Sequence, residues 1–358
     1  MAMRSLAVLA VALGFGAMVG CGTSEPSWNE TRTFKFGPYT IQPEDDITDQ
    51  CVQITLNNDS DIYISTVTLK TGTGMHHSNW FWVPEHEFPG PHWNGHNSSV
   101  DDGTFTCVDR NFDQAVAALF GGVVFAQSTQ DPMEVQQFPD GDVIKIPAHS
   151  KLVSTIHLLN PGDSTLSLKP TIALTPVPED QVTTVLAGVS FENESIALPP
   201  NAQSEFSVEC DLVAADQPPP TPNWPAPTFK LYHALAHYHS LGTGMDIEAV
   251  KADGTSTSIF QTTTQIGDSL GAMLDPPFDF TGYAKIRFTC DYYNSTNGTV
   301  TWGQELTSEM CVFLAFSDSP VDWAGGVTDV ESPGPPTMVG DVYTYSHPCY
   351  VVATPANE

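Results

Sequence analysis

Basic residues are scarce in this chain. Its 358 residues include 12 Lys and Arg against 42 Asp and Glu, which gives a formal net charge of −30 at pH 7. A protein this negative repels nucleic-acid phosphates and anionic lipid headgroups, which excludes nucleic acid as a partner. Charged residues make up only 15% of the chain and hydrophobic residues 41%, a composition that favours a folded core over disorder.

Several sequence motifs are also missing. The chain has no P-loop or dinucleotide-binding fingerprint, so nucleotide-dependent activities lack support. It has no CxxC spacing, which argues against a thiolate zinc site. Beyond the N-terminus, no apolar run reaches the roughly 20 residues that a membrane-spanning helix needs.

The N-terminus has the features of an export signal. Arg4 precedes an apolar run over residues 6–19, and Met18-Val-Gly-Cys21 resembles a bacterial lipobox. We therefore expect a signal peptide over residues 1–20, lipidation of Cys21 and a tether over residues 21–33. An ordinary secretory signal cut nearby is the alternative. The sequence thus predicts an exported lipoprotein of the cell envelope, at the outer membrane, whose lipid is its only membrane contact.

Six further cysteines remain. An even number in an oxidising compartment indicates disulfides, although six cysteines allow 15 pairings. Only two of them fall in the first half of the chain, so Cys51 and Cys107 are the one pair available within that half. The other four are Cys210, Cys290, Cys311 and Cys349.

Strand patterns dominate the rest of the chain. Residues 51–56 and 62–69 alternate apolar and polar positions and are rich in β-branched residues. Similar runs occupy residues 143–146, 151–158, 166–174, 205–213, 229–239, 284–290 and 311–316. Residues 111–119 favour a short helix, and the proline-rich residues 218–227 favour a surface loop.

Short strands separated by Gly, Pro and Asp turns are typical of β-sandwiches. We therefore predict an all-β protein with two tandem antiparallel β-sandwich domains of jelly-roll type. The proposed domains are residues 34–180 and 181–358.

A pair of histidines stands in one expected strand. His237 and His239 are two residues apart, so a strand would direct both imidazoles to one face, where they could bind one ion. A polar pair on the solvent face of an edge strand is the alternative.

Three further histidines lie in patterns that do not by themselves indicate a metal site. His76 and His77 are adjacent and could bind one ion only at a strand end, a bulge or a bend, which Gly72 and Gly74 could permit. A surface dipeptide is the alternative. His157 lies in an apolar strand pattern, where a lone histidine is usually a hydrogen-bonded core residue.

Met310 stands directly before Cys311. Alone it would be a gap-filling core methionine, but beside imidazoles its thioether is a soft ligand that favours copper. A further set, His86, His92 and His96, lies among prolines that forbid the helix of a zinc protease, and it favours a polar loop over a metal site.

Four motifs in order resemble the copper type II, ascorbate-dependent monooxygenases, the family of the peptidylglycine and dopamine hydroxylases. They are Met75-His-His77, Ile156-His-Leu158, His237-Tyr-His-Ser-Leu-Gly242 and Ser308-Glu-Met-Cys311. The resemblance runs from about residue 51 to residue 349.

The resemblance implies two copper ions in separate sites, which face each other across a solvent-filled cleft. His76, His77 and His157 would form the electron-supplying site of the first domain. His237, His239 and Met310 would form the catalytic, oxygen-activating site of the second. The implied reaction is hydroxylation of a C–H bond by O₂, with electrons from ascorbate or a similar reductant. The resemblance also implies three disulfides, which join Cys51 to Cys107, Cys210 to Cys349 and Cys290 to Cys311.

The chain departs from the peptide-amidating members of the family. Where they have an arginine that holds the substrate carboxylate, this chain has Leu235, and Val312 and Leu314 replace polar and aromatic residues. We therefore expect a small or apolar substrate. A copper-binding surface lipoprotein without catalytic activity is the alternative function.

Overall fold

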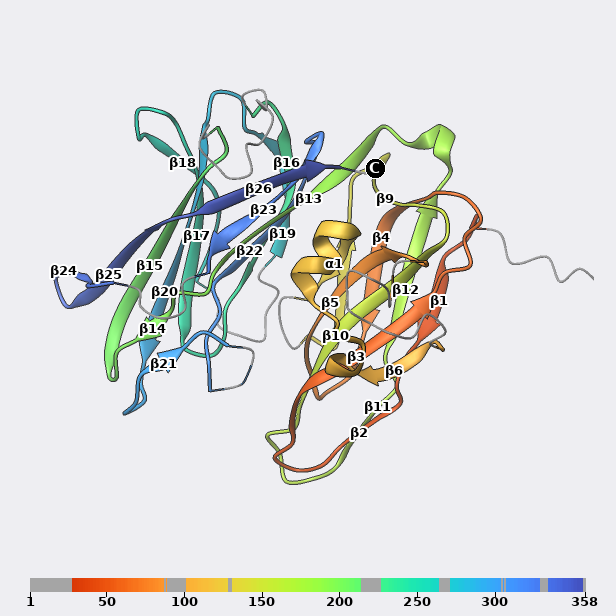
Figure 1. Cartoon of the computed structure of the whole chain (residues 1–358), viewed down its shortest axis with the longest axis horizontal. Coiled ribbons are helices and arrows are strands. Elements are labelled where there is room, and N and C mark those ends of the chain that lie inside the picture. Colours follow the sequence, from red (N-terminus) through yellow and green to blue (C-terminus); the bar gives the residue numbers. More distant parts are fainter. Residues whose placement is uncertain are drawn as a thin grey trace, which may run out of the picture.

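The alternation of apolar and polar residues places most of the described chain in strands. The computed structural model describes residues 28–86, 88, 101–127, 131–213, 227–263, 271–303, 305, 307–328 and 334–356. These residues form two β-sandwich lobes that lie side by side (Figure 1). The predicted all-β class is confirmed.

The described residues of the N-terminal lobe form twelve strands and two short helices. They are β1 (Arg32–Lys35), β2 (Tyr39–Ile41), β3 (Asp46–Thr55), β4 (Ile62–Lys70), β5 (Met75–Pro84), β6 (Gly103–Thr106), η2 (Cys107–Arg110), α1 (Gln114–Phe120), β7 (Gly122–Ala126), β8 (Met133–Gln137), β9 (Asp142–Ile146), β10 (Ser150–Leu159), β11 (Leu166–Leu168) and β12 (Thr171–Val177).

Its core lies between two layers. One layer is the five-stranded sheet β6-β3-β10-β5-β7. The other layer is the N-terminal part of an eleven-stranded sheet, with strands in the order β1-β12-β4-β9 and with β8 paired to β4. Trp80 of β5 and Ile156 of β10 pack in one apolar cluster with Ile64 and Leu69 of β4, and all four side chains are fully buried. Burial of each such side chain contributes about 1.5–3 kcal/mol.

The C-terminal lobe follows the 3-10 helix η3 (Glu179–Gln181). Its strands are β13 (Thr184–Asn193), β14 (Ala197–Leu198), β15 (Ala202–Asp211), β16 (Lys230–His237), β17 (Gly242–Val250), β18 (Ser256–Thr262), β19 (Gly271–Asp279), β20 (Lys285–Asn294), β21 (Val300–Thr301), β22 (Val312–Ser317), β23 (Val321–Val327), β24 (Thr337–Val339), β25 (Val342–Pro348) and β26 (Tyr350–Pro355).

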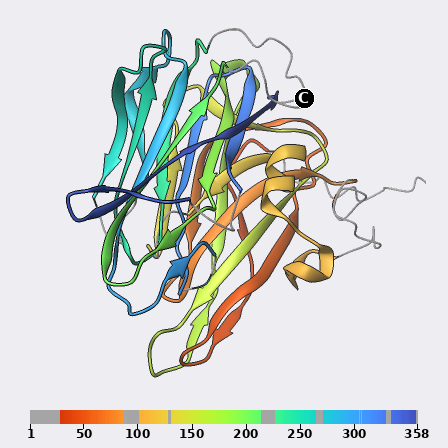
Figure 2. The same ribbon diagram turned by 60° about the vertical axis from the view of Figure 1, so that its left-hand side comes forward.

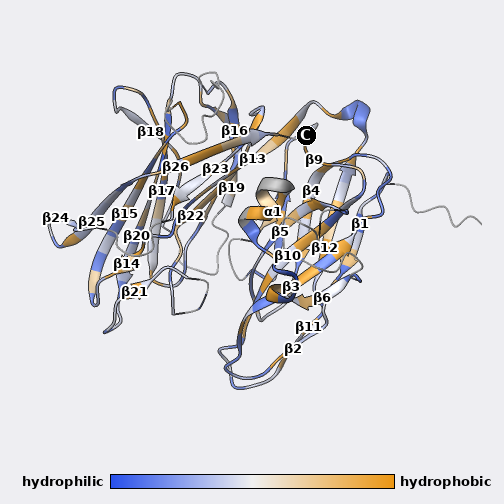
Figure 3. Cartoon of the chain, in the orientation of Figure 1, coloured by the Kyte–Doolittle hydropathy of each residue, from blue (hydrophilic) through white to orange (hydrophobic). Residues whose placement is uncertain are grey.

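The six-stranded sheet β18-β17-β20-β15-β25-β24 covers strands β13, β22, β16 and β19. Ile247 and Phe288 of the six-stranded sheet share an apolar cluster with Phe191, Ala234 and Phe313 of the other layer. Figure 2 shows this layering from a second direction. Figure 3 shows apolar residues concentrated on the strands and hydrophilic residues in many of the connecting turns.

The two lobes are joined by more than their connecting segment. Strand β9 of the first lobe pairs in parallel with β13 of the second, so one eleven-stranded sheet extends through both. A small apolar cluster also spans the junction, where the rings of Phe138 and Phe316 lie 5.2 Å apart, edge to face, with Ile144, Leu186 and Tyr232 around them. The lobes therefore meet directly at this point.

Three disulfides each join two segments of the same lobe. Cys51 bonds Cys107, Cys210 bonds Cys349, and Cys290 bonds Cys311, which are the pairs that the family resemblance implies. Such bonds are typical of proteins that fold outside the cytoplasm. Among the residues that the structure describes, no helix has the length and apolar character needed to cross a bilayer.

One local expectation, the short helix, can be compared directly with the structure. The short helix is present as α1, and its N-cap Asp113 accepts a hydrogen bond from the backbone N–H of Val116 (2.9 Å). The signal peptide over residues 1–20 and the lipidated Cys21 lie outside the described residues, as does nearly all of the proline-rich stretch over residues 218–227.

Candidate metal centre

The adjacent histidines lie at a β-bulge. In the pairing of β10 with β5, His157 faces His77 while Leu158 faces Met75, so His76 is the extra residue. A bulge breaks the alternation of side chains, and both His76 and His77 are buried, at 5% and 6% exposure. The bulge that the sequence requires for a shared site is therefore present. Gly74 precedes it with a φ of +109°, a conformation that favours glycine.

His157 brings a third imidazole to the same place. Its Nε2 donates a hydrogen bond to Oδ1 of Asp46 (2.6 Å), which leaves Nδ1 with its lone pair. That Nδ1 lies 3.2 Å from Nε2 of His77. Two ligands about 2.0 Å from one tetrahedral ion lie roughly 3.3 Å apart, so this pair fits a shared ion.

The C-terminal lobe supplies two imidazoles from the end of β16. His237 is the last residue of β16, and His239 follows it with 2% exposure. Nδ1 of His239 donates to the carbonyl of Ser308 (2.9 Å), and Nε2 has no hydrogen-bond partner among the described residues. Because a carbonyl fixes the tautomer, Nε2 has its lone pair available for a metal.

Glu309 holds the two ligand-bearing segments of this lobe together. Its fully buried carboxylate accepts hydrogen bonds from the backbone N–H groups of His239 and Leu241, both at 2.7 Å, and from that of Met310 at 3.3 Å. Burial raises the pKa of Glu309 to about 7. The hydroxyl of Tyr292 donates to the carbonyl of Met310 (2.6 Å), so Met310 is fixed beside His239 through its backbone.

Imidazoles from both lobes gather in one place. The ring centroids of His77 and His157 lie 5.0 Å apart, those of His77 and His237 5.2 Å, and those of His76 and His239 5.8 Å. In the described part of the chain, the ligand atoms of His76, His77 and His239 lie within 4.8 Å of one another. We call these five residues the histidine group.

The imidazoles of the two lobes therefore lie next to one another in this structure, and the solvent-filled cleft that the resemblance implies does not separate them. The start of β5 and the end of β16 meet at the junction of the lobes, where the shared sheet and the apolar cluster around Phe316 hold them. Three of the expected ligands, His76, His77 and His239, form a compact set that draws on both lobes.

Burial keeps three imidazoles of the histidine group neutral. Desolvation, followed by repulsion from neighbouring imidazoles, lowers the pKa of His76 to about 3 and that of His77 well below its ordinary value. Desolvation also lowers the pKa of His239. Neutral imidazoles are the form that binds metals, so these rings are ready to act as ligands near pH 7.

Of the remaining histidine candidates, the structure describes one. His86 is exposed just beyond the end of β5, and His92 and His96 lie outside the described residues. Sequence reasoning missed Asp46 and Glu309, which orient the ligands. Glu309 lies inside the Ser308–Cys311 motif and could have been found from it, whereas nothing in the local sequence distinguishes Asp46 from its acidic neighbours.

Comparisons with known proteins add little on function. No protein-family model and no curated protein matches the chain. The major capsid protein P2 of bacteriophage PM2 is 7% identical, with a TM-score of 0.28, over 80% of this chain and 97% of that one. The PBSX exported protein XepA is 10% identical, with a TM-score of 0.21; the match covers 80% of this chain and 86% of XepA. A tandem CBM22 domain from Paenibacillus barcinonensis is 11% identical, with a TM-score of 0.19; the match covers 82% of this chain and 95% of that domain pair. Likenesses this slight do not bear on activity, so the inference of function starts from the histidine group.

Proposed function

We propose that the protein is an exported copper monooxygenase, which hydroxylates a C–H bond of a small or apolar molecule using O₂ and ascorbate or a similar reductant. The observation that carries the proposal is the histidine group, in which buried imidazoles from both lobes converge. The lipobox at Cys21 supports a tether to the outer membrane.

The donor set fits copper better than a hard cation. The compact set is made of imidazole nitrogens alone, whereas calcium and magnesium prefer oxygen ligands. Met310, fixed beside His239, would add a soft thioether that favours Cu(I). Bound copper would supply the electron transfer and oxygen chemistry, which protein side chains cannot provide.

The chain's own residues would orient the ligands. Asp46 holds the ring of His157, and the carbonyl of Ser308 holds the ring of His239. Glu309 keeps His239 and Met310 in fixed relation through backbone hydrogen bonds. Such partners keep ligand nitrogens in place and raise their basicity.

A second candidate function is metal binding without catalysis. The compact set of His76, His77 and His239 supports it, because three imidazoles can also hold zinc, which has no redox chemistry. Elemental analysis of the purified protein separates the metals: the monooxygenase proposal requires copper with little zinc.

Oxygen consumption separates catalysis from binding. Ascorbate-driven O₂ uptake by the copper-loaded protein should fall to background in Met310→Ala. Met338→Ala is the matched control, because Met338 is 51% exposed on β24 and should leave uptake unchanged. Equal and negligible uptake in all three proteins would refute the monooxygenase and favour the binding protein.

A further inference from the structure

The apolar cluster that joins the two lobes is small. Five buried residues of the described chain form it, with the rings of Phe138 and Phe316 at its centre. Beside it, residues 184–186 of β13 pair with residues 142–144 of β9 in one short stretch of ladder. Domains joined by a contact of this size are expected to move relative to each other unless something else holds them.

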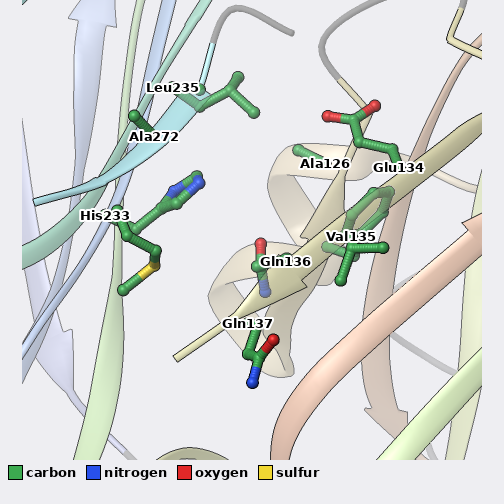
Figure 4. Close-up of a pocket in the computed structure, with 11 residues that line it drawn as sticks. Ala126, Glu134, Val135, Gln136, Gln137, His233, Leu235 and Ala272 are labelled. Atoms are coloured by element: carbon green, nitrogen blue, oxygen red, sulfur yellow. The ribbon is translucent and has the colours of Figure 1, made fainter. Parts of the chain in front are cut away.

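Further along the junction the lobes border a small pocket (Figure 4). His233 and Leu235 of β16 line it on one side, and Ala126 and Gln136 of the N-terminal lobe line it on the other. Its volume is about 70 Å³, which is room for a few water molecules. Along β16 the pocket therefore separates the apolar cluster from the histidine group, and the lobes are not packed continuously between the two.

At the histidine group the lobes meet through polar rings. The ring of His239 lies 5.8 Å from that of His76 and 6.2 Å from that of His77. Its Nε2 is shielded from solvent and has no hydrogen-bond partner among the described residues. A buried nitrogen without a partner opposes docking, because it loses its hydrogen bond to water and gains none in return. A metal ion would bind this nitrogen and so favour the docked arrangement.

Rings of opposite lobes lie as close together as rings of the same lobe. The centroids of His76 and His77, both from the N-terminal lobe, are 5.2 Å apart, and those of His77 and His237, from opposite lobes, are also 5.2 Å apart. Imidazoles whose nitrogens lie about 2.0–2.1 Å from one tetrahedral ion have centroids about 5 Å apart. These distances are therefore consistent with one ion that takes ligands from both lobes.

We propose that a single ion bound by His76, His77 and His239 acts as a clamp that keeps the two lobes docked. Metal binding and docking are then coupled: the ion stabilises the pairing of β9 with β13, and loss of the ion loosens it. The inference rests on the metal centre of the proposed function but not on oxygen chemistry. Zinc, which has no redox chemistry, should therefore act as the clamp as copper does.

Hydrogen–deuterium exchange of the full purified protein tests this coupling away from the ligands. Residue 186 lies six residues before Glu192, which is level with His237 across β22, so the β9–β13 ladder is roughly 20 Å from the histidine group. An ion that binds only the docked lobes, at about 100 times its dissociation constant, lowers the opening constant of the junction about 100-fold. Amides of residues 184–186 should therefore exchange at least about tenfold more slowly with zinc or copper than without metal.

Two ligand variants and two controls identify the cause of any slowing. His239→Ala and His76→Ala each remove a ligand from one lobe, and either should abolish the slowing at residues 184–186. Having one variant in each lobe keeps the test valid should one of them fold poorly. His86→Ala, at an exposed histidine, should keep the slowing. Strand β24 lies at the far edge of the C-terminal lobe (Figure 1), so its amides should exchange at the same rate with and without metal.

Exchange of residues 184–186 at the same rate with and without bound metal would overturn the inference. Slowing that persists in both ligand variants, or that extends equally to β24, would also overturn it. If metal slows the ladder but the copper-loaded protein consumes no oxygen, the clamp stands and the monooxygenase is refuted. Oxygen consumption without any slowing would refute the clamp and leave the monooxygenase standing.

Discussion

The hydrogen bond between Asp46 and His157 is a sensitive test of the metal site, because it lies just outside the ligands. Oδ1 of Asp46 lies 2.6 Å from Nε2 of His157, whose other nitrogen faces His77. Asp46→Ala removes the acceptor that fixes the ring. Loss of such a partner typically weakens metal binding about 10- to 100-fold, and we expect that loss of copper affinity here.

The effect on stability should be much smaller. A hydrogen bond to a charged group contributes about 1.5–3 kcal/mol, but the side chain of Asp46 is 29% exposed, so water replaces part of the interaction. We expect the free energy of unfolding of the metal-free protein to fall by about 1 kcal/mol in urea denaturation. The loss of affinity would therefore not result from unfolding.

Two companion variants complete this test. Asp46→Asn keeps an oxygen that can accept from Nε2 and should bind copper nearly as well as the wild type. Asp45→Ala removes the neighbouring carboxylate, whose contact is the backbone N–H of Gln42, and should leave copper affinity unchanged. A competition titration in which Asp46→Ala binds copper as tightly as Asp45→Ala would refute the proposed role of this hydrogen bond.

Three further predictions concern the C-terminal lobe. Glu309→Gln leaves one backbone N–H of the segment around His239 without its acceptor, so copper affinity should fall at least tenfold in the same titration. Burial raises the pKa of Glu192 to about 7, so this carboxyl binds its proton more tightly in the folded state, and the stability that it contributes is lost as the pH rises from 4.5 to 7. In urea denaturation, the free energy of unfolding of Glu192→Gln should therefore rise relative to that of the wild type by up to about 3 kcal/mol as the pH goes from 4.5 to 7. Copper affinity should not change. A difference in stability that is the same at both pH values would contradict this prediction. Replacing Cys290 and Cys311 by alanine opens a loop with a sequence separation of 21 and should cost about 3 kcal/mol, measured as a lower urea midpoint; an unchanged midpoint would contradict it.

Local patterns in the sequence predict much of the fold. Alternation at residues 51–56 and 62–69 corresponds to β3 and β4. The argument that adjacent histidines need a bulge also holds at His76, because the faces of a strand are fixed by backbone geometry. Such features depend on a few neighbouring residues, so the sequence is sufficient to predict them.

The junction of the lobes could not be predicted in the same way. The pairing of β9 with β13 and the contact of Phe138 with Phe316 join segments that lie far apart in the chain. No local pattern reports such pairings. The sequence therefore predicted the histidines but not their gathering from both lobes into one group.

Copper titration of one variant from each lobe tests most directly whether both lobes share one metal centre. His76→Ala and His239→Ala change ligands on opposite sides of the junction, and His86→Ala changes an exposed histidine as a control. A shared centre predicts that either ligand variant weakens the tightest-binding copper equivalent, while the control binds as the wild type. If instead each ligand variant lost one copper equivalent and kept the other at full affinity, the lobes would hold independent sites and the shared centre would be contradicted.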